Sequence, residues 1–452
     1  MGTITLQQAA QWCGGKIDPK YKDVTFFGAN NDTRKLNPGE LFIALQGARD
    51  GHDFIPAALE KGAAAILCTH CDGDYPAIVV PDTRIALGDI ARQERLRLDM
   101  KVVGITGSVG KSTTKEMVAA VLGSTYRVSK TPVNHNNDIG MPMAILAMPE
   151  DTQIAVLEMG MNHFGEIAYL SGIAKPDVAV IVNIGTMHIE HLGSIEGILQ
   201  AKLEILEGMP DGGTVILNGD DPLLWNLHKT LPNVTYFGVQ NKEASVIGAD
   251  VQQRDGKLQF TVACDGENSL AELPLEGQHY VLDALAAITV GVKFDVDGEK
   301  ILQSLGAFHG MSGRQEIFKA GEYTIIKDCY NAGPESMAAA LAVLRNKPGR
   351  RVAVLGDMLE LGVCTQAEHY KIGRIAAECA DVVLAYGPNS SRVVSGAVTG
   401  GMSDSLVGGY EDREKLVSAL KRLAKPGDVL LFKGSHGMHM DVALEQFLHE
   451  DR

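Results

Sequence analysis

The chain has 452 residues, a length typical of about three domains. Its content of 45% apolar and 21% charged residues is ordinary for a soluble globular protein. The formal net charge of -15 argues against nucleic acid as the main partner, because a phosphate backbone requires broad basic surfaces. The beginning of the chain lacks the pattern of a signal peptide, and no apolar run approaches the ~20 residues that span a membrane. We therefore expect a cytoplasmic protein without a membrane span.

Residues 1–83 are expected to form a small α/β domain. Thr5 and Gln8 have the spacing of a capping box, so a helix should begin there and end at the glycines 14–15. The further elements expected in this domain are a strand at 39–45, a helix at 54–61, and strands at 63–68 and 77–80.

Residues 84–313 alternate strand and helix patterns, which is typical of a parallel sheet with crossover helices. Strands are expected at 102–106, 154–158, 178–182 and 214–217. Between 234 and 275 the apolar period shifts to two, with turn signals at 254–257 and 265–266, which predicts an antiparallel patch attached to the parallel sheet.

Residues 314–452 repeat the alternation and are expected to form a small Rossmann-like domain without a nucleotide fingerprint of its own. The elements expected here are strands at 351–355, 382–385 and 429–432, and helices at 365–379, 412–424 and 438–449. The predicted fold class is therefore α/β, in three domains, with a P-loop-type central ATPase domain.

The most informative segment is residues 101–116, where a short β-branched strand leads into a glycine-rich turn and then a helix. Such a turn lets backbone N–H groups converge on phosphate oxygens at the positive end of the helix. Lys111 would then reach the β- and γ-phosphates, and Ser112 would place a hydroxyl on Mg²⁺. The standard motif requires glycine where this chain has Ile105. A dinucleotide-type glycine turn is the alternative, but it does not explain the Lys-Ser pair after the last glycine.

Three further side chains follow the strands of this predicted sheet. Glu158 ends a buried strand, where ligands of such sheets bind, so it is placed to hold the expected Mg²⁺. His188 lies in the loop after the next strand, and the sequence leaves open whether it is a metal ligand or a structural residue. Lys202 lies on the following amphipathic helix, and from sequence alone it is expected to be a surface lysine.

A cluster of amides and an aspartate at residues 134–142 precedes another expected helix. Such clusters form turns and caps by default. Because this one lies close to the glycine-rich turn along the chain, contacts with phosphates or with a substrate are the alternative.

Four segments resemble the Mur ligase family, whose members make the cytoplasmic precursor of peptidoglycan: residues 106–112, 136–142, 158–162 and 188–190. The glycine turn of that family has the same shifted spacing. The segments at 277–279, 313–314, 328–332 and 433–435 follow in the family's order, so the resemblance covers essentially the whole chain. Within the family, Asn136 and Asn137 together with residues 356–362 are similar to the member that adds D-alanyl-D-alanine to UDP-N-acetylmuramoyl-tripeptide.

The resemblance implies a ligase that uses ATP to convert a substrate carboxylate into an acyl phosphate, which an amine then attacks. It implies two Mg²⁺ ions, one shared by Ser112 and Glu158 and one bound by His188, and a Lys202 that CO₂ has carbamylated. The implied catalytic residues are Lys111, Glu158, His188, Lys202, Arg314 and Asp328. The implied nucleotide-binding residues are Gly107, Ser108, Val109, Gly110, Lys111, Ser112, Thr113, Asn137, His279, Arg314, Asp328, Tyr330 and Asn331. The implied substrate-binding residues are Asp32, Thr33, Arg34, Asn136 and Asn137, the first three in a segment at 32–42 that binds the UDP end in the family.

The chain departs from the family pattern at three positions. Tyr280 and Asp283 stand where asparagines are usual, and His436 stands where arginine is usual. Asp283 cannot donate hydrogen bonds as asparagine does, so the adenine contacts that the resemblance implies at that position are an open question. We expect small-molecule substrates, no nucleic acid partner and a monomeric enzyme.

Three alternatives were weighed against this interpretation. The sister ligase that adds the third stem residue generally has an Asn-Pro-Arg signature in its third domain, where this chain has residues 356–362. Ligases of the folylpolyglutamate type lack a segment like 32–42. A non-catalytic nucleotide-binding partner protein would be expected to lose Lys111, Glu158, His188 or Lys202, and all four are present.

Overall fold

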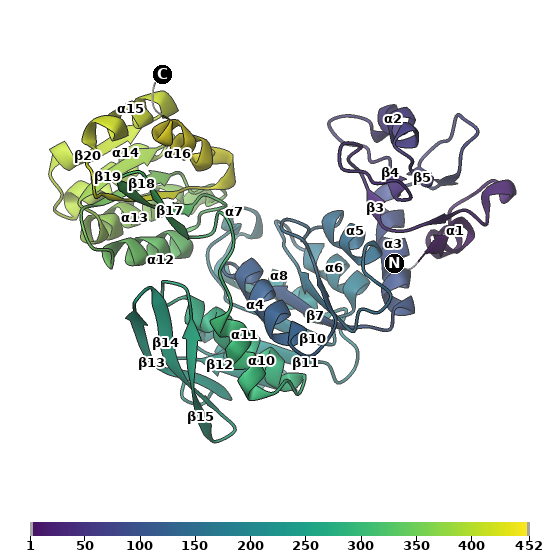
Figure 1. Cartoon of the computed structure of the whole chain (residues 1–452), viewed down its shortest axis with the longest axis horizontal. Coiled ribbons are helices and arrows are strands. Elements are labelled where there is room, and N and C mark those ends of the chain that lie inside the picture. Colours follow the sequence, from purple (N-terminus) through teal and green to yellow (C-terminus); the bar gives the residue numbers. More distant parts are fainter. Residues whose placement is uncertain (1–2, 450–452) are drawn as a thin grey trace.

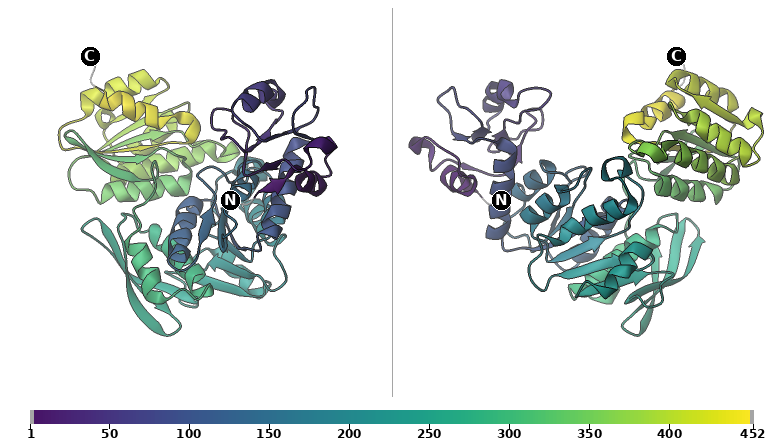
Figure 2. Two further views of the ribbon diagram at one scale, coloured as in Figure 1. Left: turned by 45° about the vertical axis from the view of Figure 1, so that its right-hand side comes forward. Right: turned by 180° about the vertical axis from the view of Figure 1, so that it is seen from behind.

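The computed structural model of the chain describes residues 3–449, whose strands form four sheets distributed over three α/β units (Figure 1). The outermost residues of the predicted first and third domains, 1–2 and 450–452, lie outside the described part. The N-terminal and C-terminal units lie at opposite ends of the central unit (Figures 1 and 2). None of the helices in residues 3–449 is long and apolar enough to cross a membrane.

The N-terminal unit contains a two-stranded sheet and a four-stranded parallel sheet. Helix α1 (Leu6–Cys13) begins at the predicted capping box and ends at Gly14, whose φ of 67° is left-handed. The other elements are β1 (Ile4–Thr5), β2 (Thr25–Phe26), β3 (Ala29–Asn30), β4 (Leu41–Ile43), α2 (Ile55–Glu60), β5 (Ala65–Cys68) and β6 (Ala77–Val79). The helix and strands predicted between 39 and 80 are confirmed with shorter bounds, whereas β1, β2 and β3 are too short to give a sequence pattern.

Helix α3 (Thr83–Arg97) joins the first unit to the central one. Asp82 caps its N-terminus by accepting hydrogen bonds from the N–H groups of Arg84 and Ile85. Its buried face packs against α1 on one side and against α5 (Gly140–Leu146) and α6 (Glu166–Ala174) of the central unit on the other. One apolar core therefore continues from the first unit into the second.

The central sheet has nine strands in the order β15-β14-β13-β12-β11-β10-β7-β9-β8. Its strands are β7 (Lys101–Thr106), β8 (Val128–Lys130), β9 (Ile154–Glu158), β10 (Val178–Ile181), β11 (Thr214–Asn218), β12 (Val234–Gly238), β13 (Val246–Arg254), β14 (Lys257–Cys264) and β15 (Glu267–Leu273). The predicted antiparallel patch is present only in β13, β14 and β15. Assigning β12 to it was wrong, because β12 pairs in parallel with both neighbours. The last three residues of β12 are buried in succession, as expected for a strand covered on both faces.

Helices cover both faces of this sheet. One face carries α4 (Lys111–Gly123), α10 (Tyr280–Lys293) and α11 (Gly298–Gly306), whose apolar residues share a core with alternate residues of β7 and β9. The other face carries α5, α6, α7 (Ile189–Leu192), α8 (Ile195–Leu203) and α9 (Pro222–Trp225). This doubly wound arrangement places the ends of β7, β9 and β10 at one edge, where such sheets bind ligands.

The C-terminal unit has a six-stranded sheet in the order β16-β17-β21-β18-β19-β20, parallel except for the edge strand β16. Its strands are β16 (Glu316–Ala320), β17 (Tyr323–Asp328), β18 (Arg351–Gly356), β19 (Val382–Tyr386), β20 (Val407–Tyr410) and β21 (Val429–Lys433). Its helices are α12 (Pro334–Arg345), α13 (Thr365–Cys379), α14 (Ser390–Thr399), α15 (Arg413–Leu423) and α16 (Met440–Leu448). The predicted Rossmann-like alternation is confirmed, with helix 365–379 at its predicted bounds. The strands β16, β17 and β20 were not predicted.

Candidate active site

A cavity of about 920 Å³ lies between the central and C-terminal units and extends to helix α3. The central unit contributes the ends of β7 and β9, including Lys111 and Glu158, and the C-terminal unit contributes the ends of β17 and β21, including Asp328 and Lys433. Arg84 of α3 lines the far end. The cavity therefore lies at the carboxyl edges of two parallel sheets at once.

The glycine-rich loop between β7 and α4 has a fixed shape. Gly110 has a φ of 87°, and a Cβ there would lie 2.5 Å from Oδ1 of Asp283, so glycine is required. Asn183, after β10, accepts hydrogen bonds from the N–H groups of Ser108 and Val109 at 3.1 and 2.9 Å, and its amide donates to the carbonyl of Val109 at 2.8 Å. The loop is thus held by the neighbouring strand, and the N-terminus of α4 faces the cavity.

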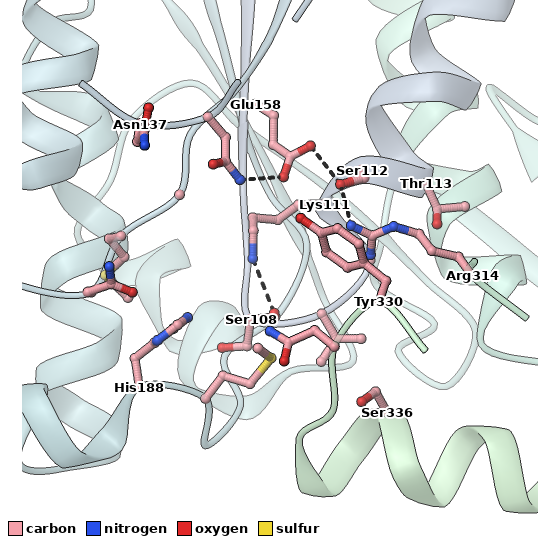
Figure 3. Close-up of a pocket in the computed structure, with 18 of the residues that line it drawn as sticks. Ser108, Lys111, Ser112, Thr113, Asn137, Glu158, His188, Arg314, Tyr330 and Ser336 are labelled. Carbon is pink, nitrogen blue, oxygen red and sulfur yellow. Dashed lines mark hydrogen bonds between the residues drawn. The ribbon is translucent and has the colours of Figure 1, made fainter. Parts of the chain in front are cut away.

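Lys111 opens helix α4 and folds back over the loop. Its Nζ donates to the carbonyls of Gly107 and Ser108 at 2.7 and 3.2 Å (Figure 3). Burial lowers the pKa of Lys111, an effect that the nearby Glu158 opposes and that Arg314 reinforces. Within residues 3–449 this amine bonds only to backbone carbonyls, so an anionic ligand could take their place.

Ser112 and Glu158 meet at the end of β9 (Figure 3). The Ser112 hydroxyl donates to Oε2 of Glu158 at 2.7 Å, and the amide of Asn136 donates to Oε1 at 2.9 Å. The guanidinium of Arg314, from the C-terminal unit, donates to the same Ser112 oxygen at 2.9 Å. A hydroxyl and a carboxylate on neighbouring positions are the oxygen donors that Mg²⁺ prefers, and they leave positions for phosphate and water. The predicted pair therefore fits one Mg²⁺.

Sequence reasoning missed Lys115, which is completely buried one helical turn after Lys111. Its Nζ donates to the carbonyl of Thr131 at 2.7 Å and lies 3.9 Å from Oε2 of Glu158. The available signal was a lysine at i+4 from Lys111 that shares a helical face with the apolar Val118 and Leu122. This buried ammonium lies close to two carboxylates, Glu116 at 3.2 Å and Glu158 at 3.9 Å.

His188 begins α7 with a left-handed φ of 65°, and its Nδ1 lies 2.6 Å from Oε2 of Glu360 in the C-terminal unit. Burial, and secondarily the charge of Lys111, lower the pKa of His188. Because Glu360 bonds to Nδ1, Nε2 remains available as a metal ligand. No three His, Cys, Asp or Glu side chains among the described residues gather in a conventional metal cluster, so any Mg²⁺ here would depend on ligand oxygens.

The expectation that Lys202 is a surface lysine was wrong. Its side chain is only 2% exposed, because α8 turns this face toward the sheet. Burial and the charge of Lys111 hold the pKa of Lys202 well below its usual value. In the described part of the chain, its amine has no hydrogen bond and no ion pair. A buried lysine amine without a hydrogen-bond partner is unusual, and a strongly perturbed group beside a cavity is a candidate for a functional role.

The C-terminal unit brings the other predicted nucleotide-binding residues to the cavity. The Arg314 guanidinium lies 4.0 Å from the centre of the Tyr330 ring, and the Tyr330 hydroxyl bonds to Asn134. Lys433 bonds to Asp328 at 2.7 Å and to the carbonyl of Asn331 at 3.0 Å. Of these contacts, the Tyr330–Asn134 bond crosses to the central unit, as does the bond from Arg314 to Ser112.

Asp283 of α10 and His279, the residue that caps this helix, both line the cavity. Asp283 is buried against the glycine loop, where it accepts a hydrogen bond from the Thr114 hydroxyl at 2.9 Å. Burial raises the pKa of Asp283 to about 7, so this carboxyl can carry a proton near neutrality and then donate as an amide does. His279 also lines the cavity, and burial lowers its pKa to about 4.

The predicted substrate-binding residues are divided. Asn136 and Asn137 line the cavity, whereas Asp32, Thr33 and Arg34 lie outside it in the N-terminal unit, where Asp32 and Arg34 form an ion pair at 2.7 Å. Sequence reasoning missed Tyr169 on α6, which lines the arm of the cavity that leads toward that unit. The buried Tyr169 hydroxyl has no hydrogen-bond partner within residues 3–449 and lies against Gly88 of α3.

The chain is similar to known proteins over most of its length. Three family models match: the Mur ligase family catalytic domain at 28–95, the Mur ligase middle domain at 105–291 and the Mur ligase glutamate ligase domain at 313–436. The chain belongs to the Mur ligase family. A curated Mur ligase from Bacillus subtilis, UDP-N-acetylmuramoyl-tripeptide–D-alanyl-D-alanine ligase, is 39% identical over 98% of both chains. The corresponding ligase from Escherichia coli is 35% identical over 98% of this chain and 97% of its own.

Solved structures of Mur ligases have the same architecture. A crystal structure of MurF from Acinetobacter baumannii superimposes with a TM-score of 0.91 at 30% identity, covering 100% of both chains. A MurF ligase from Thermotoga maritima, in complex with ADP, has a TM-score of 0.81 at 30% identity and covers 93% of this chain and 97% of its own. The predicted α/β fold with three domains is therefore confirmed for this Mur ligase.

Proposed function

We propose that this Mur ligase uses ATP to join D-alanyl-D-alanine to UDP-N-acetylmuramoyl-tripeptide, giving the pentapeptide precursor of peptidoglycan. Relatives that carry this activity in their names match over nearly the full chain. The observation that carries the proposal is the convergence of Lys111, Ser112 and Glu158 with Arg314 at one cavity.

A carboxylate reacts poorly with an amine, because its charge repels the nucleophile and oxide is a very poor leaving group. Transfer of the γ-phosphoryl group of ATP to the carboxylate oxygen makes an acyl phosphate, from which phosphate leaves after the amine attacks the carbonyl carbon. Negative charge spreads over the phosphoryl oxygens during the transfer. Lys111, the amides at the start of α4 and Arg314 are placed to stabilise it.

The oxygen donors at the end of β9 fit Mg²⁺, which supplies charge neutralisation and alignment of the phosphates when bound. Ser112 and Glu158 would hold one ion, and Nε2 of His188 would bind a second. Asn136 orients Glu158 through its amide, and Glu360 orients the imidazole of His188.

We also propose that Lys202 is carbamylated. A neutral amine is the form that reacts with CO₂, and the lowered pKa of Lys202 favours that form. Its nitrogen bonds to the carbon of CO₂ and releases one proton, which converts a potential cation into an anion. An anion beside Lys111 and His188 is compatible with two nearby divalent cations, whereas a second ammonium next to Lys111 is not.

The remaining assignments are part of the same proposal. Asn136 and Asn137 would contact the substrate near the reacting carboxylate, and Asp32, Thr33 and Arg34 would contact its UDP end. The domains would span 1–83, 84–313 and 314–452, the third contributing to the ATP and dipeptide sites. The enzyme would act as a monomer.

Phosphate release from ATP and Mg²⁺, with UDP-N-acetylmuramoyl-tripeptide and with or without D-alanyl-D-alanine, tests the reaction. The expected result is dipeptide-dependent release with a matching mass gain on the UDP substrate. Release only with UDP-N-acetylmuramoyl-dipeptide and a free diamino acid would instead assign the chain to the sister ligase.

A further inference from the structure

Lys115 is a completely buried lysine of α4 that does not line the cavity. Its Nζ donates a hydrogen bond to the carbonyl oxygen of Thr131 at 2.7 Å. Within residues 3–449, no other donor reaches this carbonyl oxygen. Thr131 is itself completely buried, and a buried carbonyl group without a donor is costly. The bond therefore ties Thr131, the residue after β8, to helix α4.

The other polar groups of Thr131 bond to strand β9. Its N–H donates to the carbonyl of Val156 at 3.1 Å, and its hydroxyl accepts a hydrogen bond from the N–H of Glu158 at 3.0 Å. The N–H, the carbonyl and the hydroxyl of Thr131 are thus all bonded. This residue joins α4, through Lys115, to the strand end that carries the Glu158 carboxylate.

Thr131 begins the loop 131–139, which leads from β8 to α5 and whose second half lines the cavity. In this loop, the amide of Asn136 donates to Oε1 of Glu158 at 2.9 Å, and the Asn136 carbonyl accepts a hydrogen bond from the N–H of Gly160 at 2.8 Å. Because Asn136 follows only five positions after Thr131, the place where the loop begins limits where this amide can lie. A displaced Thr131 would therefore draw Asn136 away from the carboxylate.

An alternative role for Lys115 is that of a counter-charge only. Its Nζ lies 3.2 Å from Oε1 of Glu116 and 3.9 Å from Oε2 of Glu158. However, Glu116 also forms an ion pair with Lys130, and Glu158 accepts hydrogen bonds from two other side chains. Both carboxylates therefore have further partners, whereas the carbonyl of Thr131 has Lys115 alone among the described residues. The contacts favour the hydrogen bond over the charge as the reason for a lysine here.

We propose that Lys115 is a positioning residue for the Glu158 carboxylate. It acts through Thr131, which sets the start of the loop 131–139 and thereby keeps Asn136 bonded to that carboxylate. The inference rests on the Mg²⁺ site of the proposed function, and it assigns a residue that touches neither the metal nor a substrate. Removal of a partner that orients a metal ligand typically weakens metal binding by roughly tenfold to a hundredfold.

Calorimetric titration with ADP, in Mg²⁺ and in EDTA, tests this role without turnover. The Mg²⁺ gain, defined as the ratio of the Kd for ADP in EDTA to the Kd in Mg²⁺, should exceed one in wild type. Methionine is nearly as long as lysine but donates no hydrogen bond, so the Mg²⁺ gain of Lys115→Met should fall by roughly tenfold. Its Kd in EDTA should stay close to that of wild type, because the glycine loop is not altered. A Mg²⁺ gain in Lys115→Met equal to that of wild type would overturn the proposal.

Two double variants separate position from charge. Glu116→Gln removes a carboxylate, so Lys115→Met with Glu116→Gln has the same local net charge as wild type. Recovery of the Mg²⁺ gain in this double variant would make Lys115 a counter-charge and contradict the proposal. Asn136→Ala removes the bond through which the loop acts, so Lys115→Met should cause little further loss in the Asn136→Ala protein. Fully additive losses would exclude the route through Asn136.

Thr131→Val tests the same connection in a protein that keeps Lys115, and it decides the question if Lys115→Met does not fold. Valine fills nearly the same volume as threonine, but its side chain cannot accept the hydrogen bond from the N–H of Glu158. We expect a smaller Mg²⁺ gain than in wild type, with the Kd in EDTA nearly unchanged. An undiminished gain would exclude Thr131 as the connection.

Lys130→Met is a matched control. Lys130 also forms an ion pair with Glu116, but its side chain is 45% exposed and it does not bond to the carbonyl of Thr131. Its loss should leave the Mg²⁺ gain unchanged, and a fall as large as that of Lys115→Met would contradict the proposal. A wild type without any Mg²⁺ gain would contradict the proposed metal site itself, whereas a gain that is equal in wild type and Lys115→Met would contradict only this inference.

Discussion

The carboxyl ends of parallel strands in both the central and the C-terminal sheet line the cavity. The lysines Lys111 and Lys202 on the central side differ from Lys433 on the C-terminal side in their hydrogen-bond partners. On the central sheet's side, Lys111 bonds to backbone carbonyls, and Lys202 has no partner among residues 3–449. On the C-terminal sheet's side, Lys433 forms an ion pair with Asp328. A buried amine without a carboxylate is available to an anionic ligand, whereas removal of a paired amine leaves a buried carboxylate uncompensated. The comparison separates lysines that serve the reaction from one that serves the structure.

The largest effect on stability is expected at Lys433. The change Lys433→Met leaves Asp328 without its cation in a partly buried position, which costs about 3 to 5 kcal/mol. Urea unfolding followed by circular dichroism should show a lower midpoint. The double variant Lys433→Met with Asp328→Leu should recover part of the loss, and an unchanged midpoint in the single variant would contradict the pairing argument.

At Lys111 we expect a large loss of activity and little change in stability. Lys111→Met removes a cation from the phosphoryl group and should lower kcat/KM by roughly a hundredfold to a thousandfold. Because its present partners are carbonyls that the loop can expose to water, the unfolding midpoint should stay close to that of wild type. A variant that unfolds as readily as Lys433→Met would show that Lys111 is structural as well.

Lys202 differs from Lys111 and Lys433, because its proposed carbamylated form is an anion. Lys202→Ala should lower activity by roughly a hundredfold and should not respond to added bicarbonate, whereas wild type freed of CO₂ should regain activity with it. With ¹³C-bicarbonate, a carbamate carbon resonance is expected in wild type and not in Lys202→Ala. Full activity of Lys202→Ala would refute the assignment.

The smallest effect concerns a carboxyl, Asp283. Its pKa of about 7 in the folded protein lies above the ordinary aspartate value of 3.8, so the folded state keeps a proton that the unfolded state releases between about pH 4 and 7. Stability contributed by this group is therefore present at low pH and lost as pH rises through 7. In wild type the free energy of unfolding should fall with rising pH by about 1 to 2 kcal/mol more than in Asp283→Asn. This is less than the pKa shift alone would give, because the structure relaxes around a buried charge. Urea unfolding midpoints of both proteins at pH 5 and pH 8 measure this difference. An equal change in midpoint between the two pH values for both proteins would contradict the prediction.

The sequence predicted those parts of the fold and of the candidate site that a local pattern of residues specifies. The glycine loop, Ser112 and the strand that ends in Glu158 follow from residue type and spacing alone. The burial of Lys202 does not, because it depends on how α8 rotates against a sheet formed by distant strands. Strand β17, which carries Asp328, was missed because it follows β16 in an antiparallel hairpin, outside the alternation of strand and helix on which the prediction relied. Nor could any local pattern place Glu360 against His188, since 172 residues separate them.

The bond between Asn183 and the glycine loop has a thermodynamic consequence. Because the side chain of one strand end already fixes the N–H groups of Ser108 and Val109, little chain entropy is left to lose when phosphates arrive. The free energy of nucleotide binding is then not reduced by the cost of ordering the loop. One amide after β10 thereby prepares the phosphate site before a nucleotide arrives.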